Sequence, residues 1–515
     1  MKGDCTMNWL MLKSGSDVRG TAAGNDIVLN ETVARNLGAA FALTLAEKTQ
    51  KPVSQISVSL GRDSRVSGPS LLNAAAEGIR MSGARAVRFD LCTTPAMYMS
   101  TITEGFEMDG AIMITASHHP WNKNGLKFFT PRGGLEGKEV EELLIRAGGM
   151  NPMNTDSGNG SVTDRAFLPV YMDQLADRIK KGLDVQTARP LEGLHVVVDA
   201  GNGAGGFYAD LLRKLGADTS GSQFLDPDGM FPNHIPNPEN REAMASLSQA
   251  VLSSKADLGV IFDADCDRAA VVDSDGKEIN RNRLIALISA ILLEEKKGRT
   301  IVTDSVTSSG LKKFIEQRGG VHYRYKRGYR NVIDEAIRLN QDGIDCPLAI
   351  ETSGHAALRE NHFLDDGMYL VTVLIVKAMK MKEKGQNLGM LIASLEEPRE
   401  ALEIRLHITA PDFRKKGQEA IDRVSSCVSD SSDCFVAPDN REGIRVIFHQ
   451  DGQAESGWFL LRLSVHDPVL PINLESDLKG GVRRMARFLY DAFAKMDGIQ
   501  TEALGQAAGI PVSQG

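Results

Sequence analysis

Three segments of the chain open in the same order: a β-branched apolar run, a turn rich in Gly, Ser and Asp, and a helical pattern closed by glycine. They begin at Ile56, His195 and Thr300. In the first segment the turn covers residues 61–67 and the helix is expected to end near Gly83. Strands that alternate with helices indicate α/β units on a largely buried sheet. Any α/β protein contains such openings, so triplication is an interpretation, and we expect three topologically similar α/β domains with mixed sheets.

The last part of the chain has a different pattern. Two strand-like runs, GIRVIFHQ and GWFLLRLSV, follow the strand-like ALEIRLHIT and a polar helix over residues 412–428, and a terminal helix covers residues 478–496. This pattern predicts a smaller α+β domain that begins after Pro398. The tail after Gly498 is rich in Gly, Ala and Gln, and we expect it to be frayed.

A chain of 515 residues is too long for one hydrophobic core. We expect four domains, over residues 1–180, 181–297, 298–398 and 399–515. The net charge of −8 argues against a general nucleic-acid or membrane-surface binder. The longest apolar stretch, residues 284–293, is too short to cross a bilayer and predicts a buried helix. The six cysteines form no CxxC pair and no signal peptide is evident, so we expect a cytoplasmic protein, monomeric or homodimeric.

A first candidate site lies in TASHHPWNKNGLKFF, residues 115–129. Ser117 follows the apolar run AIMIT, and His118 and Lys127 belong to the same polar loop. A hydroxyl at a strand end beside cationic and proton-carrying side chains suits holding or transferring a phosphoryl group.

A second candidate site is LGVIFDADCDRAAVVDSDG. Asp263, Asp265 and Asp267 alternate after an apolar strand, and in an extended segment they would point to one side. Three like charges need a counter-ion, and oxygen ligands favour Mg²⁺. Arg268 adds a cation suited to phosphate, and it stands where an EF-hand loop would need glycine, which excludes that loop. A solvated acidic turn is the alternative, and it suits residues 273–276, which we interpret as a hairpin turn.

Two further loops carry polar groups at strand ends. In LAIETSGHAAL, Glu351, Ser353 and His355 suit vicinal hydroxyls of a sugar, although a lone histidine is more often structural. In RLSVHDPVLPINLES, Arg462, Ser464 and His466 alternate before Pro468, as in a phosphate site. The basic turns SDVRG, with Arg19, and YKRGYRN, with Gly328, Tyr329 and Arg330, offer further phosphate contacts or are solvated loops.

Together TASHHP, DADCDR, ETSGH and RLSVHDP resemble, in order and approximate spacing, the motifs of the α-D-phosphohexomutase superfamily. That superfamily includes phosphoglucomutase, phosphomannomutase and phosphoglucosamine mutase. The resemblance covers nearly the whole chain and extends to SDVRG, GRDSRVSG, VVDAGNGAG, PDGMFPNHIPNPEN and DDGMYL. It implies four domains around a central cleft, each with one loop in the active site.

The resemblance also implies a role for each loop. Ser117 resembles the phosphorylated serine, with His118 beside it, and Asp263, Asp265 and Asp267 resemble Mg²⁺ ligands completed by the phosphoserine oxygen. Lys127 and Arg268 resemble the cationic groups beside the transferring phosphoryl. The expected substrate contacts are Arg19, Gly328, Tyr329, Arg330, Glu351, Ser353, His355, Arg462, Ser464 and His466.

Some positions depart from the superfamily pattern: Ala264 and Cys266 replace glycines, Val465, His466 and Asp467 occupy the centre of the phosphate loop, Ser16 replaces a frequent tyrosine, and Tyr329 a frequent histidine. Cys266 would make the acidic loop sensitive to oxidation, and His466 would make phosphate binding pH-dependent. These changes bear on the substrate more than on the reaction type.

We expect a Mg²⁺-dependent phosphohexomutase that moves phosphate between C1 and C6 of glucose or mannose phosphate. Hexose 1,6-bisphosphate would be its intermediate and activator. The alternatives are a phosphoglucosamine mutase, a phosphatase with Asp263 as nucleophile, and a non-catalytic sugar-phosphate sensor.

Overall fold

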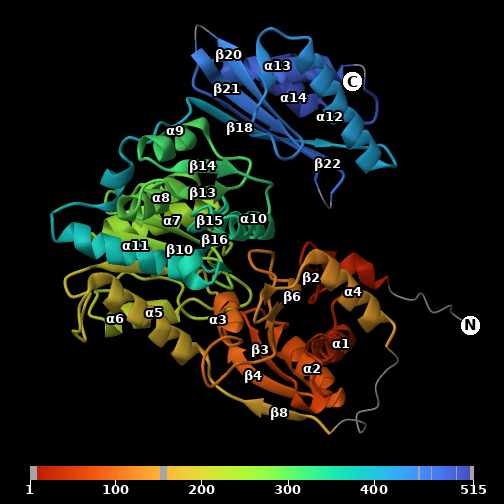
Figure 1. Cartoon of the computed structure of the whole chain (residues 1–515), viewed down its shortest axis with the longest axis vertical. Coiled ribbons are helices and arrows are strands. Elements are labelled where there is room, and N and C mark those ends of the chain that lie inside the picture. Colours follow the sequence, from red (N-terminus) through yellow and green to blue (C-terminus); the bar gives the residue numbers. More distant parts are fainter. Residues whose placement is uncertain (1–7, 151–158, 451–452, 465–466, 495, 511–515) are drawn as a thin grey trace, which may run out of the picture. The chain divides into compact units, whose positions relative to one another are not determined.

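The structure, a computed structural model, describes residues 8–150, 159–450, 453–464, 467–494 and 496–510 (Figure 1). The chain forms two compact units. The first comprises Met1–Leu284 and Ser353–Met390, and the second comprises Ile285–Thr352 and Leu391–Gly515. No helix among the described residues is long and apolar enough to cross a membrane.

The first unit contains a mixed sheet in the order β1-β2-β6-β5-β3-β4-β8, with β7 paired to β6. Strands β8, β4, β3 and β5 are mutually parallel, whereas β6 runs antiparallel to both β5 and β2. The strands are β1 (Lys13–Ser14), β2 (Asp17–Thr21), β3 (Ser57–Arg62), β4 (Arg85–Leu91), β5 (Gly110–Ile114), β6 (Lys123–Thr130), β7 (Gly133–Gly134) and β8 (Ser161–Asp164). Strand β3 is the strand of the first predicted strand–turn–helix segment.

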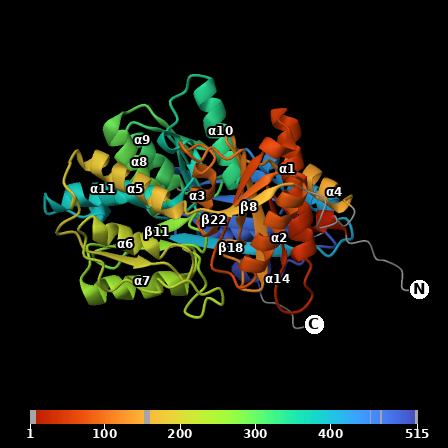
Figure 2. The ribbon, with the colours of Figure 1, turned by 90° about the horizontal axis from the view of Figure 1, so that it is seen from below.

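Helices pack on this sheet around an apolar core that includes Phe41 and Phe128, whose ring centroids are 5.0 Å apart. Helices α1 and α2 lie side by side (Figures 1 and 2), and glycines permit their close approach. A Cβ on Gly78 would lie 1.9 Å from the carbonyl oxygen of Arg35. The helices are η1 (Trp9–Leu12), α1 (Glu31–Thr49), η2 (Val53–Gln55), α2 (Gly68–Met81), α3 (Thr94–Met99) and α4 (Gly137–Gly148), whereas α5 (Leu168–Leu183) packs mainly against residues 367–382.

The second sheet of this unit has the order β12-β11-β10-β9, with β9 parallel to β10 and the other pairs antiparallel. Its strands are β9 (Val196–Asp199), β10 (Leu258–Phe262), β11 (Ala269–Asp273) and β12 (Glu278–Ile279). The antiparallel pairing of β11 with β12 confirms the hairpin turn expected over residues 273–276. Also in this unit are α6 (Phe207–Lys214), α7 (Arg241–Ser254), the antiparallel strands β16 (Ala356–Leu358) and β17 (Leu364–Asp365), η3 (Arg359–Asn361) and α11 (Gly367–Lys382).

The second unit contains the parallel strands β14, β13 and β15, with β13 in the middle. They are β13 (Thr300–Thr303), β14 (Val321–Arg324) and β15 (Leu348–Ile350), and the helices of this region are α8 (Asn282–Glu295), α9 (Ser309–Gln317), α10 (Tyr329–Gln341) and η4 (Leu388–Ile392). Residues 284–293, expected as a buried helix, lie within α8 and are buried.

The C-terminal part of the second unit is a fully antiparallel sheet in the order β18-β22-β21-β20-β19. Its elements are β18 (Glu400–His407), α12 (Phe413–Ser429), β19 (Cys434–Val436), β20 (Ile444–Gln450), β21 (Gln453–Leu461), β22 (Val469–Ser476), α13 (Gly481–Phe493) and α14 (Glu502–Ala507). The predicted fold class, three α/β domains with mixed sheets and an α+β C-terminal domain, is confirmed.

One expectation for the C-terminal sequence differs from the structure, and one strand was not predicted. Strand β22 forms directly after Pro468 and includes Pro471, whose carbonyl accepts a hydrogen bond from Arg462 N at 3.1 Å. The tail after Gly498 is not frayed over residues 501–510, because α14 packs Leu504 into the core of this sheet. The apolar residues spaced along the tail outweigh its Gly and Ala content.

Candidate active site

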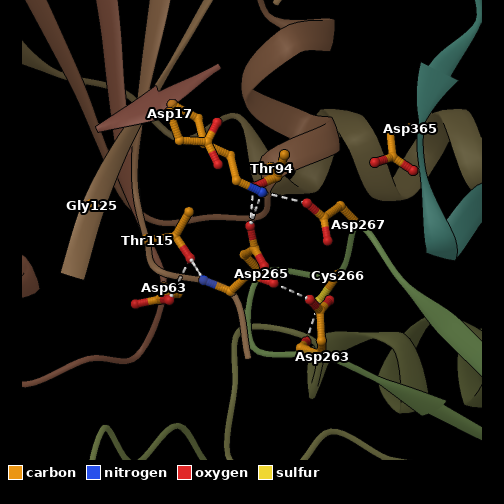
Figure 3. Close-up of polar contacts among 12 residues, drawn as sticks. Asp17, Asp63, Thr94, Thr115, Gly125, Asp263, Asp265, Cys266, Asp267 and Asp365 are labelled. Atoms are coloured by element: carbon orange, nitrogen blue, oxygen red, sulfur yellow. Dashed lines mark hydrogen bonds and ion pairs between the residues drawn. The ribbon is translucent and has the colours of Figure 1, made fainter. Parts of the chain in front are cut away.

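Ser117 follows β5 in a backbone conformation that is unusual for a residue other than glycine. Its φ is 51°, in the left-handed region, which costs on the order of 1 kcal/mol. Its N–H donates to Thr115 Oγ1 at 2.9 Å. Thr115 Oγ1 in turn donates to Asp63 at 2.7 Å (Figure 3). The side chain of Ser117 is buried, so contacts with surrounding residues determine the direction of its hydroxyl.

Arg65 holds the loop that follows Ser117. This guanidinium, fully buried, donates to the carbonyl oxygens of Ser117 at 2.5 Å and His119 at 2.6 Å through Nη2. Through Nη1 it reaches the carbonyls of Pro120 at 2.6 Å and Lys123 at 2.9 Å. Its Nε donates to Asp63 at 3.1 Å. Five hydrogen bonds from one side chain therefore fix the path of the loop, a role that sequence reasoning did not assign.

The acidic loop brings Asp263, Asp265 and Asp267 together, but not as alternating residues of a strand. Strand β10 ends before them, and the loop turns sharply at Cys266, whose φ is 66°. One carboxylate oxygen from each aspartate lies within 4.8 Å of the others (Figure 3). The convergence that we expected is present, and its cause is a tight turn.

Ser117 and the acidic loop are in direct contact. Ser117 Oγ donates to Asp263 Oδ2 at 2.7 Å. Lys127, which faces the loop from β6, donates to Asp265 Oδ2 at 2.9 Å and also to Asp267 Oδ2. The serine, the three acids and the lysine therefore form one cluster within the first unit.

The charges in this cluster are not balanced. Burial, together with the charges of Asp267 and Asp265, raises the pKa of Asp263 well above its usual value. Burial also acts on Asp267, but the positive charges of Lys127, His355 and Arg268 outweigh it and lower its pKa. Lys127 pairs with Asp265 and Asp267, and Arg268 Nε lies 3.8 Å from Asp263 Oδ2, so two cations face the three carboxylates beside Ser117.

The residues of the cluster fit a hard divalent cation. Asp265 Oδ1 and Asp267 Oδ1 are buried and have no hydrogen-bond partner among the residues that the structure describes. Buried carboxylate oxygens without partners are costly, and three carboxylates are the donor set that Mg²⁺ prefers. Asp263, Asp265 and Asp267 would hold such an ion.

His118 contacts the Ser117 hydroxyl, and Arg268 contacts both His118 and Asp263. Arg268 Nη2 donates to His118 Nδ1 at 2.7 Å, so this ring nitrogen is an acceptor. Burial and the charge of Arg268 lower the pKa of His118 to about 2, which keeps the ring neutral. Ser117 Oγ lies 3.3 Å from the same nitrogen. The structure thus places both predicted residues beside the serine hydroxyl.

The loop after Glu351 contributes Ser353 and His355 to the first unit. Gly354 has a φ of 93°, and a Cβ there would lie 2.7 Å from the carbonyl oxygen of Ala269, so glycine is required for this close approach. His355 Nδ1 lies 2.5 Å from Asp365 Oδ2 and 3.9 Å from Asp267 Oδ1. Asp365 thereby ties His355 to the edge of the acidic loop.

Arg19 lies on β2, next to β6. Its Nη2 donates to Asp17 Oδ2 at 2.8 Å. Burial lowers the pKa of His119 in the Ser117 loop, and the positive charge of Arg19 lowers it further.

The remaining predicted contacts belong to the second unit. Gly328, with a φ of 119°, precedes α10, and its N–H donates to Glu351 Oε1 at 2.6 Å. Tyr329 is the first residue of that helix. Arg330 pairs with Asp334 one turn further on, at 2.9 Å. The structure therefore joins Glu351 to the Gly328 turn, whereas Arg330 has an intrahelical partner.

Arg462 and Ser464 follow β21. Burial lowers the pKa of Arg462, and the positive charge of Arg327 lowers it further. Ser464 Oγ accepts from the backbone N–H of Asp467 at 3.2 Å. His466 lies outside the described residues. The motif therefore presents an arginine whose charge interacts with that of Arg327, the residue before Gly328.

Three residues around Ser117 were missed by sequence reasoning: Asp63, Arg65 and Thr94. The first two belong to GRDSRVSG, where a charged pair directly follows a buried strand, and that is a signal of a buried ion pair. Thr94 follows β4 in an ordinary helix start, TTPAM, and no local pattern connects it with an acidic loop 171 residues away.

Comparison with known proteins agrees with this geometry. Three family profiles match the chain: phosphoglucomutase/phosphomannomutase α/β/α domain I over residues 11–147, domain II over residues 169–276 and domain III over residues 280–398. A phosphoglucomutase of Neisseria gonorrhoeae is 29% identical over 471 residues, which are 91% of this chain and 94% of that protein. A phosphomannomutase/phosphoglucomutase of Pseudomonas putida is 30% identical over 431 residues, covering 83% of this chain and 85% of that protein.

Solved structures show the same architecture. A phosphoglucomutase/phosphomannomutase family protein of Burkholderia thailandensis has a TM-score of 0.75 at 26% identity and covers 95% of this chain and 98% of its own. The open form of parafusin from Paramecium has a TM-score of 0.70 at 16% identity, covering 97% and 96% of the two chains, which supports the fold alone. The sequence matches, the solved structures and the serine–acid cluster agree: the chain is a mutase of the phosphoglucomutase/phosphomannomutase family.

Proposed function

We propose that this phosphohexomutase interconverts hexose 1-phosphate and hexose 6-phosphate, with glucose or mannose phosphate as substrate, and that Ser117 carries the transferred phosphoryl group. The observation that carries the proposal is the 2.7 Å contact between Ser117 Oγ and Asp263, within reach of the acidic cluster and Lys127. A phosphorylated serine at this position would lie among charges that suit phosphoryl transfer, which depends mainly on positioning and charge neutralisation.

The reaction proceeds in two transfers that together consume no water. In the first, the P–Oγ bond of phosphorylated Ser117 breaks and a P–O bond forms to the free C6 or C1 hydroxyl of the sugar phosphate; that hydroxyl loses its proton, and the released Ser117 Oγ takes one up. The product is hexose 1,6-bisphosphate. In the second, the other P–O bond of the bisphosphate breaks and its phosphoryl group passes to Ser117 Oγ; Ser117 Oγ loses its proton, and the sugar oxygen that is released takes one up.

Residues around Ser117 serve these transfers in distinct ways. Arg65 and Thr115 fix the serine backbone, Lys127 supplies positive charge from β6, and Arg268 donates beside the hydroxyl through its contact with neutral His118. A divalent cation such as Mg²⁺, held by the three aspartates, would supply further positive charge at the phosphoryl oxygens.

The substrate contacts are proposed from the loops themselves and from family membership. Ser353 and His355 in the first unit, and Glu351 with the Gly328 turn in the second, suit sugar hydroxyls. Arg462 and Ser464 suit the phosphate that is not being transferred. We also propose that the chain divides into four domains, with boundaries after residues 180, 297 and 398.

Relatives support the substrate class in a general way. Structures described as N-acetylphosphoglucosamine mutase of Aspergillus fumigatus include complexes with GlcNAc-6P and magnesium and with glucose 1,6-bisphosphate, and they share the fold at 12% identity. Phosphoglucosamine therefore stays the alternative substrate for this chain.

Product analysis tests the proposal. Purified protein is incubated with glucose 1-phosphate, Mg²⁺ and a trace of glucose 1,6-bisphosphate, and glucose 6-phosphate and free phosphate are both measured. We expect isomer without free phosphate, abolished by Ser117→Ala and unaffected by Ser429→Ala, an exposed serine on α12. Free phosphate as main product with Ser117→Ala still active would indicate a phosphatase, and ligand binding without turnover a sensor. The same assay with mannose and glucosamine phosphates then ranks the substrates by turnover.

A further inference from the structure

Thr94 connects helix α3 to the acidic loop. Its Oγ1 donates to Asp265 Oδ2 at 2.5 Å, and its backbone N–H donates to the carbonyl oxygen of Asp265 at 2.9 Å (Figure 3). Thr94 is 3% exposed and Asp265 is fully buried, so water does not compete for these bonds. One residue therefore grips both the main chain and the side chain of Asp265.

These contacts determine which oxygen of Asp265 is available. Thr94 and Lys127 both donate to Oδ2. Oδ1 is buried without a hydrogen-bond partner among the described residues. A carboxylate is planar, so fixing its main chain and one oxygen also fixes the direction of the other. Oδ1 is thereby held in one direction and remains the oxygen of Asp265 without a donor among the described residues.

The helix that carries Thr94 is itself rigidly placed. Thr93 caps α3 by accepting the N–H of Ala96 through its side chain, at 3.3 Å. Thr93, Thr94, Ala96 and Met97 are all buried. A donor on such a helix end is preorganised, whereas Lys127 reaches the same oxygen with a long side chain that has several rotamers.

We propose that Thr94 is a positioning residue for the divalent cation: its hydroxyl orients the carboxylate of Asp265 so that Oδ1 is ready to bind the ion. The inference rests on the proposed function, since it takes the acidic cluster as the cation site. Partners that orient metal ligands commonly change metal affinity about 10–100-fold when removed. A role in packing alone would leave cation affinity unchanged when shape is kept.

The test measures cation binding directly, by calorimetric titration of the dephosphorylated, substrate-free protein with Mn²⁺ and with Mg²⁺. Thr94→Val keeps the shape and the backbone N–H but removes the hydroxyl, and we expect it to bind about 10–100-fold more weakly. Thr94→Ser keeps the donor and should stay within about threefold of the wild type. Thr101→Val is the matched control, because Thr101 is equally buried and its hydroxyl donates to Tyr98 O instead.

A second readout is the Mg²⁺ concentration that gives half-maximal mutase activity. We expect Thr94→Val to raise it while kcat at saturating Mg²⁺ approaches that of the wild type, because excess ion compensates for a misoriented ligand. If circular dichroism shows that Thr94→Val does not fold, Thr94→Ala, which removes the hydroxyl without introducing a new methyl group, takes its place.

The outcomes separate this inference from the proposed function. If the wild-type protein binds neither ion, the proposed function is wrong in assigning a divalent cation to the acidic cluster. A wild type that binds and a Thr94→Val variant that binds equally well would overturn the positioning role alone. A Thr94→Ser variant as weak as Thr94→Val would also overturn it, since the donor would then not be what matters.

Discussion

Nη2 of Arg65 lies 2.5 Å from the carbonyl oxygen of Ser117, so a buried cation touches the backbone of the residue proposed to carry the phosphoryl group. A guanidinium can do this because it presents five N–H donors in a fixed plane. The left-handed backbone of Ser117 would be costly in a free loop, and the hydrogen bonds from Arg65 and Thr115 hold it in place.

Replacing Arg65 should therefore affect both stability and turnover. Arg65→Met removes the donor of four loop carbonyls and the cation that pairs with buried Asp63, and we expect the free energy of unfolding to fall by about 3–5 kcal/mol. Because Ser117 is then misplaced, kcat should fall at least about 100-fold. Denaturant titration and steady-state kinetics measure the two effects.

The matched control for Arg65 is Arg88→Met, which breaks a surface ion pair with Asp164 and should cost less than about 1 kcal/mol with kcat intact. Both variants are assayed below their melting temperatures. If Arg65→Met is less stable but has a normal kcat, the loop does not need the guanidinium for catalysis.

Glu442 contacts the turn that carries Gly328. Its Oε1 accepts from Ser305 Oγ and from the backbone N–H of Arg327, the latter at 2.8 Å. If Gly328 and Glu351 bind the sugar, loosening this turn should weaken substrate binding. We expect Glu442→Ala to raise KM about tenfold, with a smaller change in kcat.

The control for Glu442 is Glu455→Ala, since Glu455 accepts a hydrogen bond from Ser309 and does not contact the Gly328 turn. Steady-state kinetics with the preferred hexose phosphate compare the two variants. Equal KM values for both would mean that Glu442 acts on stability alone.

The crossing of α1 and α2 gives a third prediction. A Cβ on Gly78 would lie 1.9 Å from Arg35 O and 3.1 Å from Ala39 N, both backbone atoms, so the two helices would have to move apart. Overpacking of this kind costs about 1–3 kcal/mol, and backbone clashes are at the upper end. We expect Gly78→Ala to lower the melting temperature of the first unit, measured by calorimetry.

The comparison for Gly78 is Gly149→Ala at the exposed end of α4, where the nearest atom would be 3.6 Å away and stability should hold or rise slightly. If both variants melt alike, the close approach of α1 and α2 is not as tight as the structure has it.

Much of this architecture follows from local sequence pattern. The three strand–turn–helix openings occur where periodicity places them, and Ser117 meets the three aspartates because each follows the end of a buried strand. The turn at Cys266 could not be predicted, because a left-handed residue other than glycine has no clear sequence signal. Strand β22 was also missed, since a proline can lie in a sheet where its missing N–H is not needed.

Contacts between distant segments were the least predictable part of the site. Arg65, Thr94 and Glu442 each act on a motif far along the chain, and their own surroundings in sequence are ordinary. The residue types and spacing of the motifs indicate their chemical roles. The residues that orient them can be identified only from the tertiary structure, because they lie far away in the sequence. The raised pKa of Asp263 likewise depends on burial, which a sequence shows only indirectly.

The carboxyl of Glu475 should make the stability of the second unit depend on pH. Glu475 lies on β22, and Trp458 Nε1 donates to its Oε2 at 3.0 Å. Burial raises its pKa from 4.5 to about 7, against the opposing charges of Arg445 and Arg324. The folded state therefore holds this proton more tightly than the unfolded state. The stabilising contribution is fully present below about pH 4.5 and is lost as the pH rises through about 7.

Glu475→Gln imitates the protonated carboxyl and should remove this dependence. At pH 5 the variant and the wild type should be nearly equally stable, whereas at pH 8 the variant should be more stable by on the order of 3 kcal/mol. Denaturant titration at both pH values measures the difference. Glu403→Gln is the control. Burial raises the pKa of Glu403, but Arg405 outweighs burial and lowers it, so removing this carboxylate should not stabilise the protein at pH 8. A Glu475→Gln variant less stable than the wild type at pH 8 would show that the carboxylate is charged in the folded protein and is stabilised there by Arg445.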